Sequence, residues 1–223
     1  MRSIPNGIAP PRNRPAVWPD PQNDSFYVFG GDLPMVAYGS RLKPLSSSTI
    51  YRYDIRASSW SQVVPSGVDS ASFTQIQNRA YGTTVNTQNT GLWLGGYSSG
   101  TTDGRGDSAE RPQKGLISYN MTTNTWKALS MKYYTPSETQ LGGKAEYLAE
   151  YGLVVIMGGS APPGELTRAQ GWQDVNYLDF RNVTLYNPET QSWYWQSTTG
   201  DYPTPRILFC SSVVPTGNGS YEM

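Results

Sequence analysis

The sequence predicts an all-β fold built from similar four-stranded antiparallel sheets, and three recurring features carry this prediction. Hydrophobic runs end in a pair of glycines at three places, Gly30-Gly31, Gly95-Gly96 and Gly158-Gly159. Each glycine pair is followed by a Tyr with a Trp seven residues after it, which gives the pairs Tyr53/Trp60, Tyr119/Trp126 and Tyr186/Trp193. Successive Trp residues of these pairs are 66 and 67 residues apart. Two independent markers that keep nearly the same step indicate a repeat array.

Each repeat divides into four short strands, which we call a, b, c and d in chain order. In the first repeat they are residues 16–18, 26–29 and 49–53, and a strand that begins near Trp60. In the second they are 79–85, 91–94, 115–119 and 126–129, and in the third 145–148, 153–157, 183–186 and 193–195. Every turn between strands c and d begins with Asp or Asn, whose side chain closes a turn by bonding the backbone two residues on. Residues 206–214 are predicted to form strand a of a fourth repeat.

The succession of apolar run, Gly-Gly and spaced Tyr and Trp resembles the kelch motif, specifically that of fungal kelch-repeat proteins related to the central domain of galactose oxidase. The resemblance covers almost the whole chain and implies part of a kelch-type β-propeller, with one four-stranded blade per repeat. It divides the chain into the end of a preceding blade with a linker (1–13), three blades (14–66, 79–131 and 142–197) and the start of a fourth (203–223). Propellers close with about four to eight blades. We therefore expect neither Met1 nor Met223 to be a natural end of the domain, and we expect an open apolar inter-blade face.

The composition argues against several functional classes. The formal net charge is zero, so no strong field attracts nucleic acid or an acidic membrane, and we expect neither partner for this segment. The chain has no His and thus no imidazole to bind a metal or act as a general base. We expect a non-catalytic protein with no cofactor and no metal ligands. Cys210 is the single cysteine and lies in an apolar run, which predicts a small buried hydrophobic residue.

The predicted binding surface is the face that carries the connections from strand b to strand c. These connections are long in every repeat, spanning residues 32–48, 97–114 and 160–181. Insertions on one face of a repeat protein often form its binding surface, so we expect a protein or peptide ligand there, although long loops also tolerate sequence drift. Four cations stand near the starts of successive strands a and form a candidate binding rim: Arg14, Arg79, Lys144 and Arg206. They either bind an acidic ligand or tie the backbone of one blade to the next.

Four sequons offer candidate N-glycosylation sites, at Asn23, Asn120, Asn182 and Asn218. All except Asn182 fall in predicted turns on the face opposite the long connections. Together with the family resemblance, they favour the ectodomain of a secreted or membrane-anchored fungal protein, although this segment contains no signal peptide or transmembrane stretch. Two alternatives stay open. One is a cytosolic kelch adaptor for a ubiquitin ligase or a cell-polarity complex, and the other is a fragment of a galactose oxidase-like copper enzyme.

Overall fold

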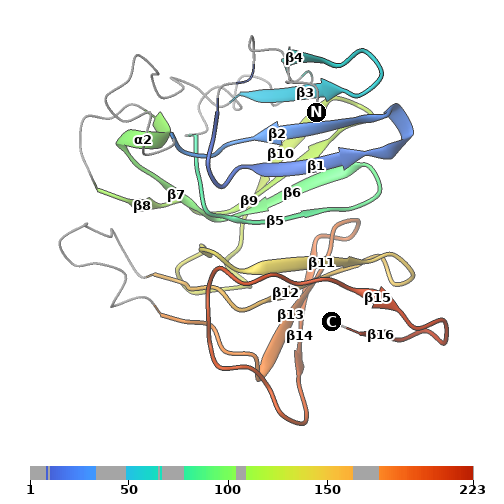
Figure 1. Cartoon of the computed structure of the whole chain (residues 1–223). Helices are drawn as coiled ribbons and strands as arrows, with labels where there is room; N and C mark the ends of the chain where they lie inside the picture. The colour runs from blue at the N-terminus through green and yellow to red at the C-terminus, as the bar shows by residue number, and fades with distance from the viewer. Residues whose placement is uncertain are drawn as a thin grey trace.

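The computed structural model describes residues 9, 11–33, 49–64, 66, 78–103, 109–162 and 176–222. These residues form an all-β structure whose main elements are three four-stranded antiparallel sheets (Figure 1). Each sheet takes its strands in the order a, b, c, d that the sequence predicts. The described helices are a single 3-10 turn, η1 (Pro21–Asn23), and the four-residue helix α2 (Gly100–Asp103).

The first sheet contains β1 (Ala16–Asp20), β2 (Ser25–Phe29), β3 (Ile50–Asp54) and β4 (Ser59–Val63). The second contains β5 (Thr83–Asn86), β6 (Thr90–Leu94), β9 (Leu116–Asn120) and β10 (Thr125–Leu129). The third contains β11 (Lys144–Leu148), β12 (Leu153–Met157), β13 (Asn182–Asn187) and β14 (Ser192–Ser197). Two short hairpins accompany the sheets, β7 (Tyr97–Ser98) with β8 (Arg111–Pro112) and β15 (Val214–Pro215) with β16 (Tyr221–Glu222).

The three Tyr/Trp pairs occupy the same place in the three sheets. In each, the Tyr of strand c lies directly opposite the Trp of strand d, as Tyr53↔Trp60, Tyr119↔Trp126 and Tyr186↔Trp193. Directly opposed aromatic residues are the kind of cross-strand pair that stabilises an antiparallel ladder. The repeat inferred from the sequence is therefore a structural repeat, with matching register in all three sheets.

The turns between strands c and d close as the sequence predicts. The Oδ1 atom of Asp54 accepts a hydrogen bond from the backbone N of Ala57 at 2.8 Å. Asn120 and Asn187 each accept two backbone N–H bonds in the same way, at 2.9–3.0 Å. The residue before strand d has a positive φ in every sheet, at Ser58, Asn124 and Gln191. The Asp or Asn side chain holds the chain in the turn while that residue reverses its direction.

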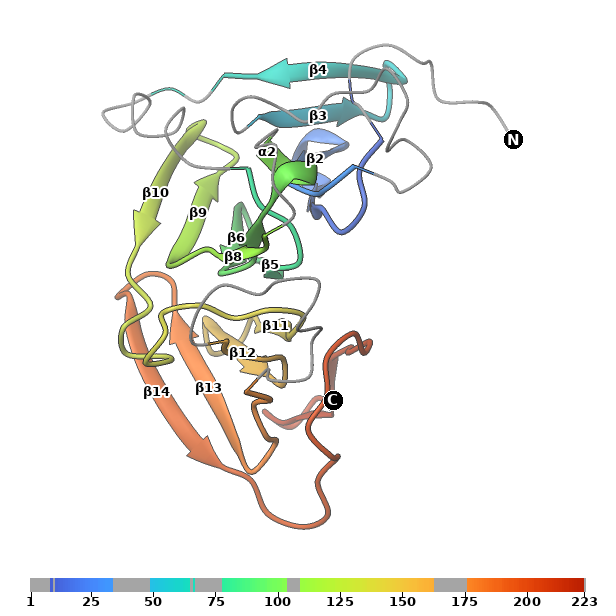
Figure 2. The same cartoon turned by 90° about the vertical axis from the view of Figure 1, so that its left-hand side faces the viewer.

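The three sheets lie side by side, with strands β1, β5 and β11 at their inner edges and β4, β10 and β14 on the outside (Figure 2). Aromatic residues fill the space between the first and second sheets: Trp18, Phe29, Trp93, Tyr119 and Trp126. Aliphatic residues and one Tyr dominate between the second and third sheets: Leu92, Leu94, Leu116, Val154, Ile156 and Tyr186. Burial in this second core raises the pKa of Tyr186 to about 12. The second sheet thus packs both of its faces against neighbours.

The glycine pairs lie where one sheet meets the next. Gly31 N donates to Arg79 O at 2.8 Å, Gly96 N to Gln140 O at 2.9 Å, and Gly159 N to Arg206 O at 2.9 Å. Both glycines of every pair have positive φ. A Cβ atom on Gly95 would lie 2.4 Å from the Gln140 carbonyl oxygen. The glycines are needed because the neighbouring backbone comes too close for a side chain and because their φ disfavours one.

The structure corrects two predicted inner strands. Strand β5 begins at Thr83 rather than residue 79, because Tyr81 has a φ of 66° and Ala80 forms only an isolated bridge with Tyr97. Residues 206–213 form no strand, so only Val214–Pro215 of the predicted 206–214 strand is extended in a ladder. Leu208 has a φ of 57°, which interrupts an extended backbone, and Val214–Pro215 pair only with Tyr221–Glu222.

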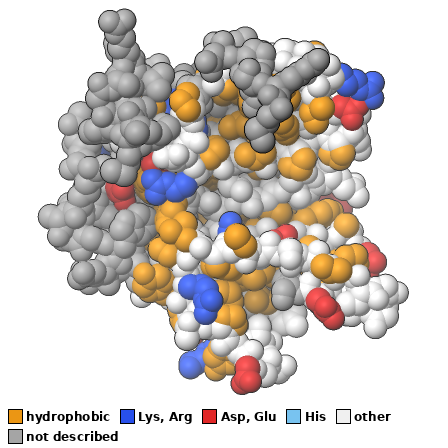
Figure 3. All heavy atoms as spheres, in the orientation of Figure 1, with side chains coloured by type: hydrophobic (Ala, Val, Ile, Leu, Met, Phe, Trp, Pro, Cys, Tyr) orange, Lys and Arg blue, Asp and Glu red, His pale blue; other side chains and the backbone are white. Residues whose placement is uncertain are grey.

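Cys210 is exposed and not buried as predicted. It lies beside the face of the third sheet that is turned away from the second. This face is hollowed and largely apolar, with one cavity of about 360 Å³ lined by Leu153, Val155, Val183 and Leu185, among others. A second cavity, of about 410 Å³, includes Cys210 in its lining. The expected open apolar face is therefore present. In Figure 3 the described part of the surface is mostly hydrophobic or uncharged, with scattered charged side chains.

Adding a methyl group at Gly95 tests the close approach between sheets. Gly95 has a φ of 61° and Gly152 a φ of 63°, but nothing lies within 4 Å of a Cβ atom at Gly152. Both alanine variants carry the same backbone strain, of roughly 1 kcal/mol. We expect Gly95→Ala to lower the free energy of unfolding by about 1–3 kcal/mol more than Gly152→Ala, because Gln140 must also move. Urea unfolding of both variants measures this difference, and equal losses would contradict the proposed contact.

The raised pKa of Tyr186 predicts a loss of stability at alkaline pH. Below the ordinary tyrosine pKa of about 10, the phenol is neutral in both the folded and the unfolded chain. Between pH 10 and the folded value of about 12, the unfolded chain releases this proton more readily, so the free energy of unfolding falls. We expect Tyr186→Phe to lose less stability than the wild-type chain between about pH 8 and pH 12, by roughly 1–3 kcal/mol. Parallel pH-dependent urea titrations check this, and identical pH profiles would contradict it.

Candidate functional site

The candidate binding rim rests on an alignment of cations that the structure corrects. The carbonyls that accept a bond from the second glycine of the preceding repeat belong to Arg79, Gln140 and Arg206. The bridges Asn13↔Asp32, Ala80↔Tyr97 and Leu141↔Ser160 place Arg12 at the same position in the first repeat. Arg14 and Lys144 therefore lie two and four residues past the equivalent position. The four cations of the predicted rim do not form one structurally equivalent set.

Arg79 is a buried residue between sheets. Its Nη1 donates to the carbonyls of Gly95 and Lys114, both at 3.4 Å, and burial lowers its pKa to about 10. Gln140, at the equivalent position, donates from Nε2 to the carbonyl of Gly158 at 2.7 Å. In both sheets a side-chain donor thus satisfies the carbonyl of the first glycine in the pair. This contact favours the tethering interpretation at Arg79, whereas binding of an acidic ligand by the rim stays a prediction.

The other members of the predicted rim differ in their surroundings. Arg14 forms an ion pair with the buried carboxylate of Asp32 and lies over the rings of Tyr81 and Tyr97, 4.9 and 5.7 Å from their centroids. Burial by itself would lower the pKa of Arg14, but Tyr97 and Asp32 raise it. Lys144 is half-buried at the start of β11, and Arg206 is exposed and donates to Thr204.

The four sequon asparagines lie where the sequence places them. Asn23 ends η1 between β1 and β2, Asn218 lies between β15 and β16, Asn120 ends β9, and Asn182 begins β13. Asn23, Asn182 and Asn218 are exposed, and Asn120 is half-buried. Asn120 accepts backbone bonds through Oδ1, which leaves its Nδ2 available for a glycan.

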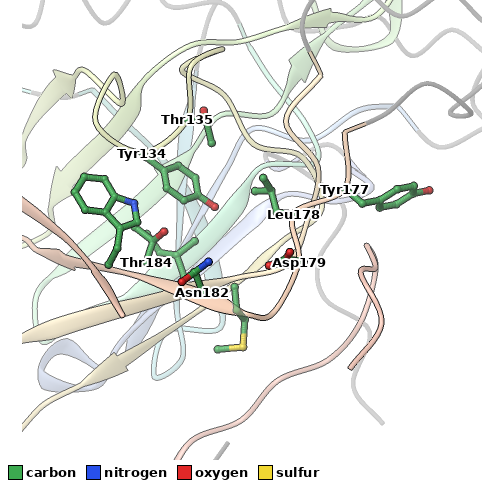
Figure 4. Close-up of a pocket in the computed structure, with 11 residues that line it drawn as sticks. Tyr134, Thr135, Tyr177, Leu178, Asp179, Asn182 and Thr184 are labelled. Carbon is green, nitrogen blue, oxygen red and sulfur yellow. The ribbon is translucent and has the colours of Figure 1, made fainter. Parts of the chain in front are cut away.

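A pocket of about 320 Å³ with a mixed polar and apolar lining lies between the second and third sheets (Figure 4). We call it the Trp195 pocket. It is lined by residues of the β10–β11 and β12–β13 connections and of strands β12, β13 and β14: Tyr134, Thr135, Ile156, Met157, Gly158, Tyr177, Leu178, Asp179, Asn182, Thr184 and Trp195. The pocket opens on the face that carries the long b–c connections.

The pocket exists because the third sheet has smaller residues where the second has large ones. Ile156 pairs with Thr184 in the third sheet, and Trp93 pairs with Ile117 at the equivalent place in the second. Trp93 and Ile117 are almost fully buried against the first sheet. Replacing an indole by an isoleucine side chain and an isoleucine by a threonine leaves space and introduces a hydroxyl. Trp195, which stands where the second sheet has Ala128, walls this space from the outer strand.

Local hydrogen bonds fix the polar residues of the pocket. Asp179 accepts a bond from the backbone N of Arg181 at 3.0 Å, and Ser197 Oγ donates to Asn182 Oδ1 at 3.0 Å. Leu178 N donates to Gly159 O at 2.9 Å and so holds the segment that carries Asp179 against the sheet. The Nδ2 group of Asn182 is left as a donor that can bind a ligand.

Tyr134 enters the pocket from the β10–β11 connection. Its ring stacks on Trp193 with centroids 5.5 Å apart, and Figure 4 shows its hydroxyl pointing toward the space between Leu178 and Asn182. The loop is held by Thr135, whose Oγ1 donates to Thr139 O at 3.0 Å and accepts from Thr139 N at 3.1 Å. Burial raises the pKa of Tyr134, so its phenol stays neutral and can both donate and accept.

Sequence reasoning identified Asn182 only as a sequon and Trp195 only as part of a strand, and it missed Tyr134, Asp179 and Thr184. The sequence nevertheless contains a signal for Thr184. When the repeats are aligned on their Tyr/Trp pairs, Thr184 takes the position that Ile117 has in the second repeat, so a polar residue replaces an apolar one. Of the long connections, residues 34–48, 104–108 and 163–175 lie outside the described residues, as do 1–8. No group of three or more Cys, Asp or Glu that could hold a metal occurs within the described ranges.

Comparison with protein-family models gives no match for this chain, and comparison with curated proteins gives none either. In the part of the chain that the structure describes, no helix is long and apolar enough to cross a membrane.

Substitutions at Arg79 test whether it acts as a backbone tether. Arg79→Gln and Arg79→Met remove the same charge and leave side chains of similar size, but only Gln keeps a donor, as Gln140 does naturally. We expect the Met variant to be less stable than the Gln variant by about 1 kcal/mol, because the buried carbonyls of Gly95 and Lys114 lose this donor, although Gly95 O keeps its bond from Trp93 Nε1 at 2.9 Å. Urea unfolding measures the difference. Two variants of equal stability would show that the Gly95 carbonyl does not need this donor.

Proposed function

We propose that this chain forms blades of a kelch-type β-propeller that binds a ligand without catalysis, on the face carrying the long b–c connections. Three equivalent sheets, joined by equivalent backbone bonds with their inner strands adjacent, support this architecture. A sandwich pairs two sheets face to face. Here the second sheet directs Trp93 to the first sheet and Leu92 and Leu94 to the third, as a propeller blade does between two neighbours.

The observation that carries the ligand-binding proposal is the Trp195 pocket. It is concave, mixes aromatic and polar side chains, and lies where the b–c connection reaches the sheet. Its volume of about 320 Å³ falls at the lower end of the usual range for small-molecule sites. Functional residues of repeat proteins concentrate on such connections because a rigid scaffold positions them. The ligand is either a small molecule or one side chain or ring of a larger partner.

The face that carries the short a–b and c–d turns, which we call the short-turn face, also supports binding on the face with the long b–c connections. Two hollows there, of about 210 and 410 Å³, both include the sequon residue Asn120 in their lining. A glycan on the free Nδ2 of Asn120 would cover them and leave the Trp195 pocket accessible, whereas a glycan on Asn182 would occupy a donor of that pocket, so the proposal requires Asn182 to be unmodified. We propose that the chain belongs to the ectodomain of a secreted or membrane-anchored fungal protein, with sugars mainly on the short-turn face.

Ligand mapping by NMR tests the proposed binding face. The full chain is titrated with a panel of monosaccharides, short peptides and small ammonium and carboxylate compounds. We expect binders to perturb the resonances of residues 134–135, 178–179, 182, 184 and 195, because these line the Trp195 pocket. Perturbations confined to residues 120–125 and 187–191 on the short-turn face would contradict the proposal, and so would a panel without a binder.

A further inference from the structure

We propose that the Trp195 pocket binds one ring of a neutral sugar, an inference that rests on the proposed ligand-binding function and specifies its ligand. A pyranose ring has apolar C–H faces and hydroxyl groups around its edge. It therefore needs an aromatic surface for the ring face and several groups that donate or accept hydrogen bonds around that surface. The pocket offers both.

Trp195 supplies the aromatic surface. Its side chain is 56% exposed, although it is a large indole on the outer strand of a sheet. The equivalent positions of the first and second sheets hold Gln62 and Ala128, so the fold does not require an aromatic residue there. An exposed Trp that walls a polar hollow is suited to cover the face of a ligand ring.

The polar groups around Trp195 suit hydroxyl partners. Asn182 offers its Nδ2 donor, Tyr134 offers a neutral phenol, and Thr184 offers a hydroxyl close to the floor. Asp179 can accept bonds through the carboxylate oxygen that is not used by the backbone of Arg181. A ligand hydroxyl both donates and accepts, so it can pair with any of these groups.

The charges and the geometry argue against other ligand classes. The lining contains one carboxylate and no Lys or Arg, so it lacks the cation that a phosphate or a carboxylate ligand needs. An ammonium ligand would need a cage of aromatic faces. Figure 4 shows the Tyr177 side chain directed away from the space between Tyr134 and Asn182, and the ring face of Tyr134 is already stacked on Trp193. Trp195 is therefore left as a single wall and not as one side of a cage.

The test uses the full chain, produced without N-glycans so that Asn182 carries no sugar of its own. Glucose, galactose, mannose and N-acetylglucosamine are titrated separately by ligand-observed NMR, with tetramethylammonium chloride and sodium acetate as the competing classes. We expect at least one sugar to bind with a Kd of about 1 mM, as is usual for a ligand this small.

Variants then assign the binding to the pocket. Trp195→Ala is expected to weaken sugar binding at least about tenfold, and Thr184→Val, which replaces the hydroxyl by a methyl group of similar size, by about tenfold. The matched control is Tyr194→Ala, because Tyr194 is the neighbouring residue on β14, is 48% exposed and faces the other side of the sheet. It should leave the Kd within about twofold. If Trp195→Ala lowers the urea midpoint of unfolding, the affinities of Trp195→Phe and Thr184→Val for the sugar are compared with that of the wild-type chain instead.

The outcomes separate the two proposals. If no sugar binds up to about 50 mM, far above the expected Kd, the sugar assignment is wrong. If tetramethylammonium binds instead and Trp195→Ala abolishes that binding, the sugar assignment is also wrong but the binding face stands. If a sugar binds equally well to the wild-type chain and to Trp195→Ala and Thr184→Val, its site lies elsewhere and both the pocket and its assignment fail.

Discussion

The backbone hydrogen bond from the second glycine of each pair to the next repeat is the constraint on which the rest of the structure depends. It joins Gly31 to Arg79, Gly96 to Gln140 and Gly159 to Arg206 with nearly the same length. A bond between two backbones fixes the position of one sheet relative to the next more closely than side-chain packing can, because neither partner has rotamers. It also requires a residue without Cβ at the point of contact, which explains why both glycines recur while the preceding apolar residues vary.

Because the backbone bonds set the spacing between the sheets, the size of the side chains between them decides how completely that space is filled. Between the first and second sheets, stacked and edge-on aromatic rings fill this space. The ring centroid of Phe29 lies 5.6 Å from that of Trp93 and 5.7 Å from that of Trp18. Between the second and third, the residues are mainly aliphatic, and the ring of Tyr134 fills part of the outer edge by stacking on Trp193. The Trp195 pocket is the part of the space between the second and third sheets that these side chains leave unfilled. It is thus a product of sequence differences within a geometry that the repeats hold constant.

The fold was predictable from the sequence to the extent that its signals were local and repeated. Tyr53, Tyr119 and Tyr186 lie opposite their Trp partners because seven residues allow a turn closed by Asp or Asn and a return in register. The prediction of the cation rim aligns Arg14 and Lys144 with Arg79 and Arg206 because all four side chains are positively charged. The positions that are structurally equivalent to Arg79 and Arg206 hold Arg12 and Gln140 instead. Equivalence there is defined by backbone bonds and by the positive φ shared by Arg14, Tyr81, Gly142 and Leu208, and neither can be seen in residue type. The irregular course of residues 206–213 was missed because strand formation depends on a ladder partner, which propensity does not report.

The pocket also has a cost that an ordinary packing position does not have. Filling the site as the second sheet does, with the equivalents of Trp93 and Ile117, would bury more apolar surface, and each buried methylene contributes roughly 0.8 kcal/mol. The third sheet instead places a hydroxyl at Thr184, leaves an indole exposed at Trp195, and surrounds them with polar groups held by their own hydrogen bonds. A departure from the packing rules at a concave, partly polar position is typical of a functional site. The departure at Ile156 and Thr184 therefore supports the proposal that this pocket binds a ligand.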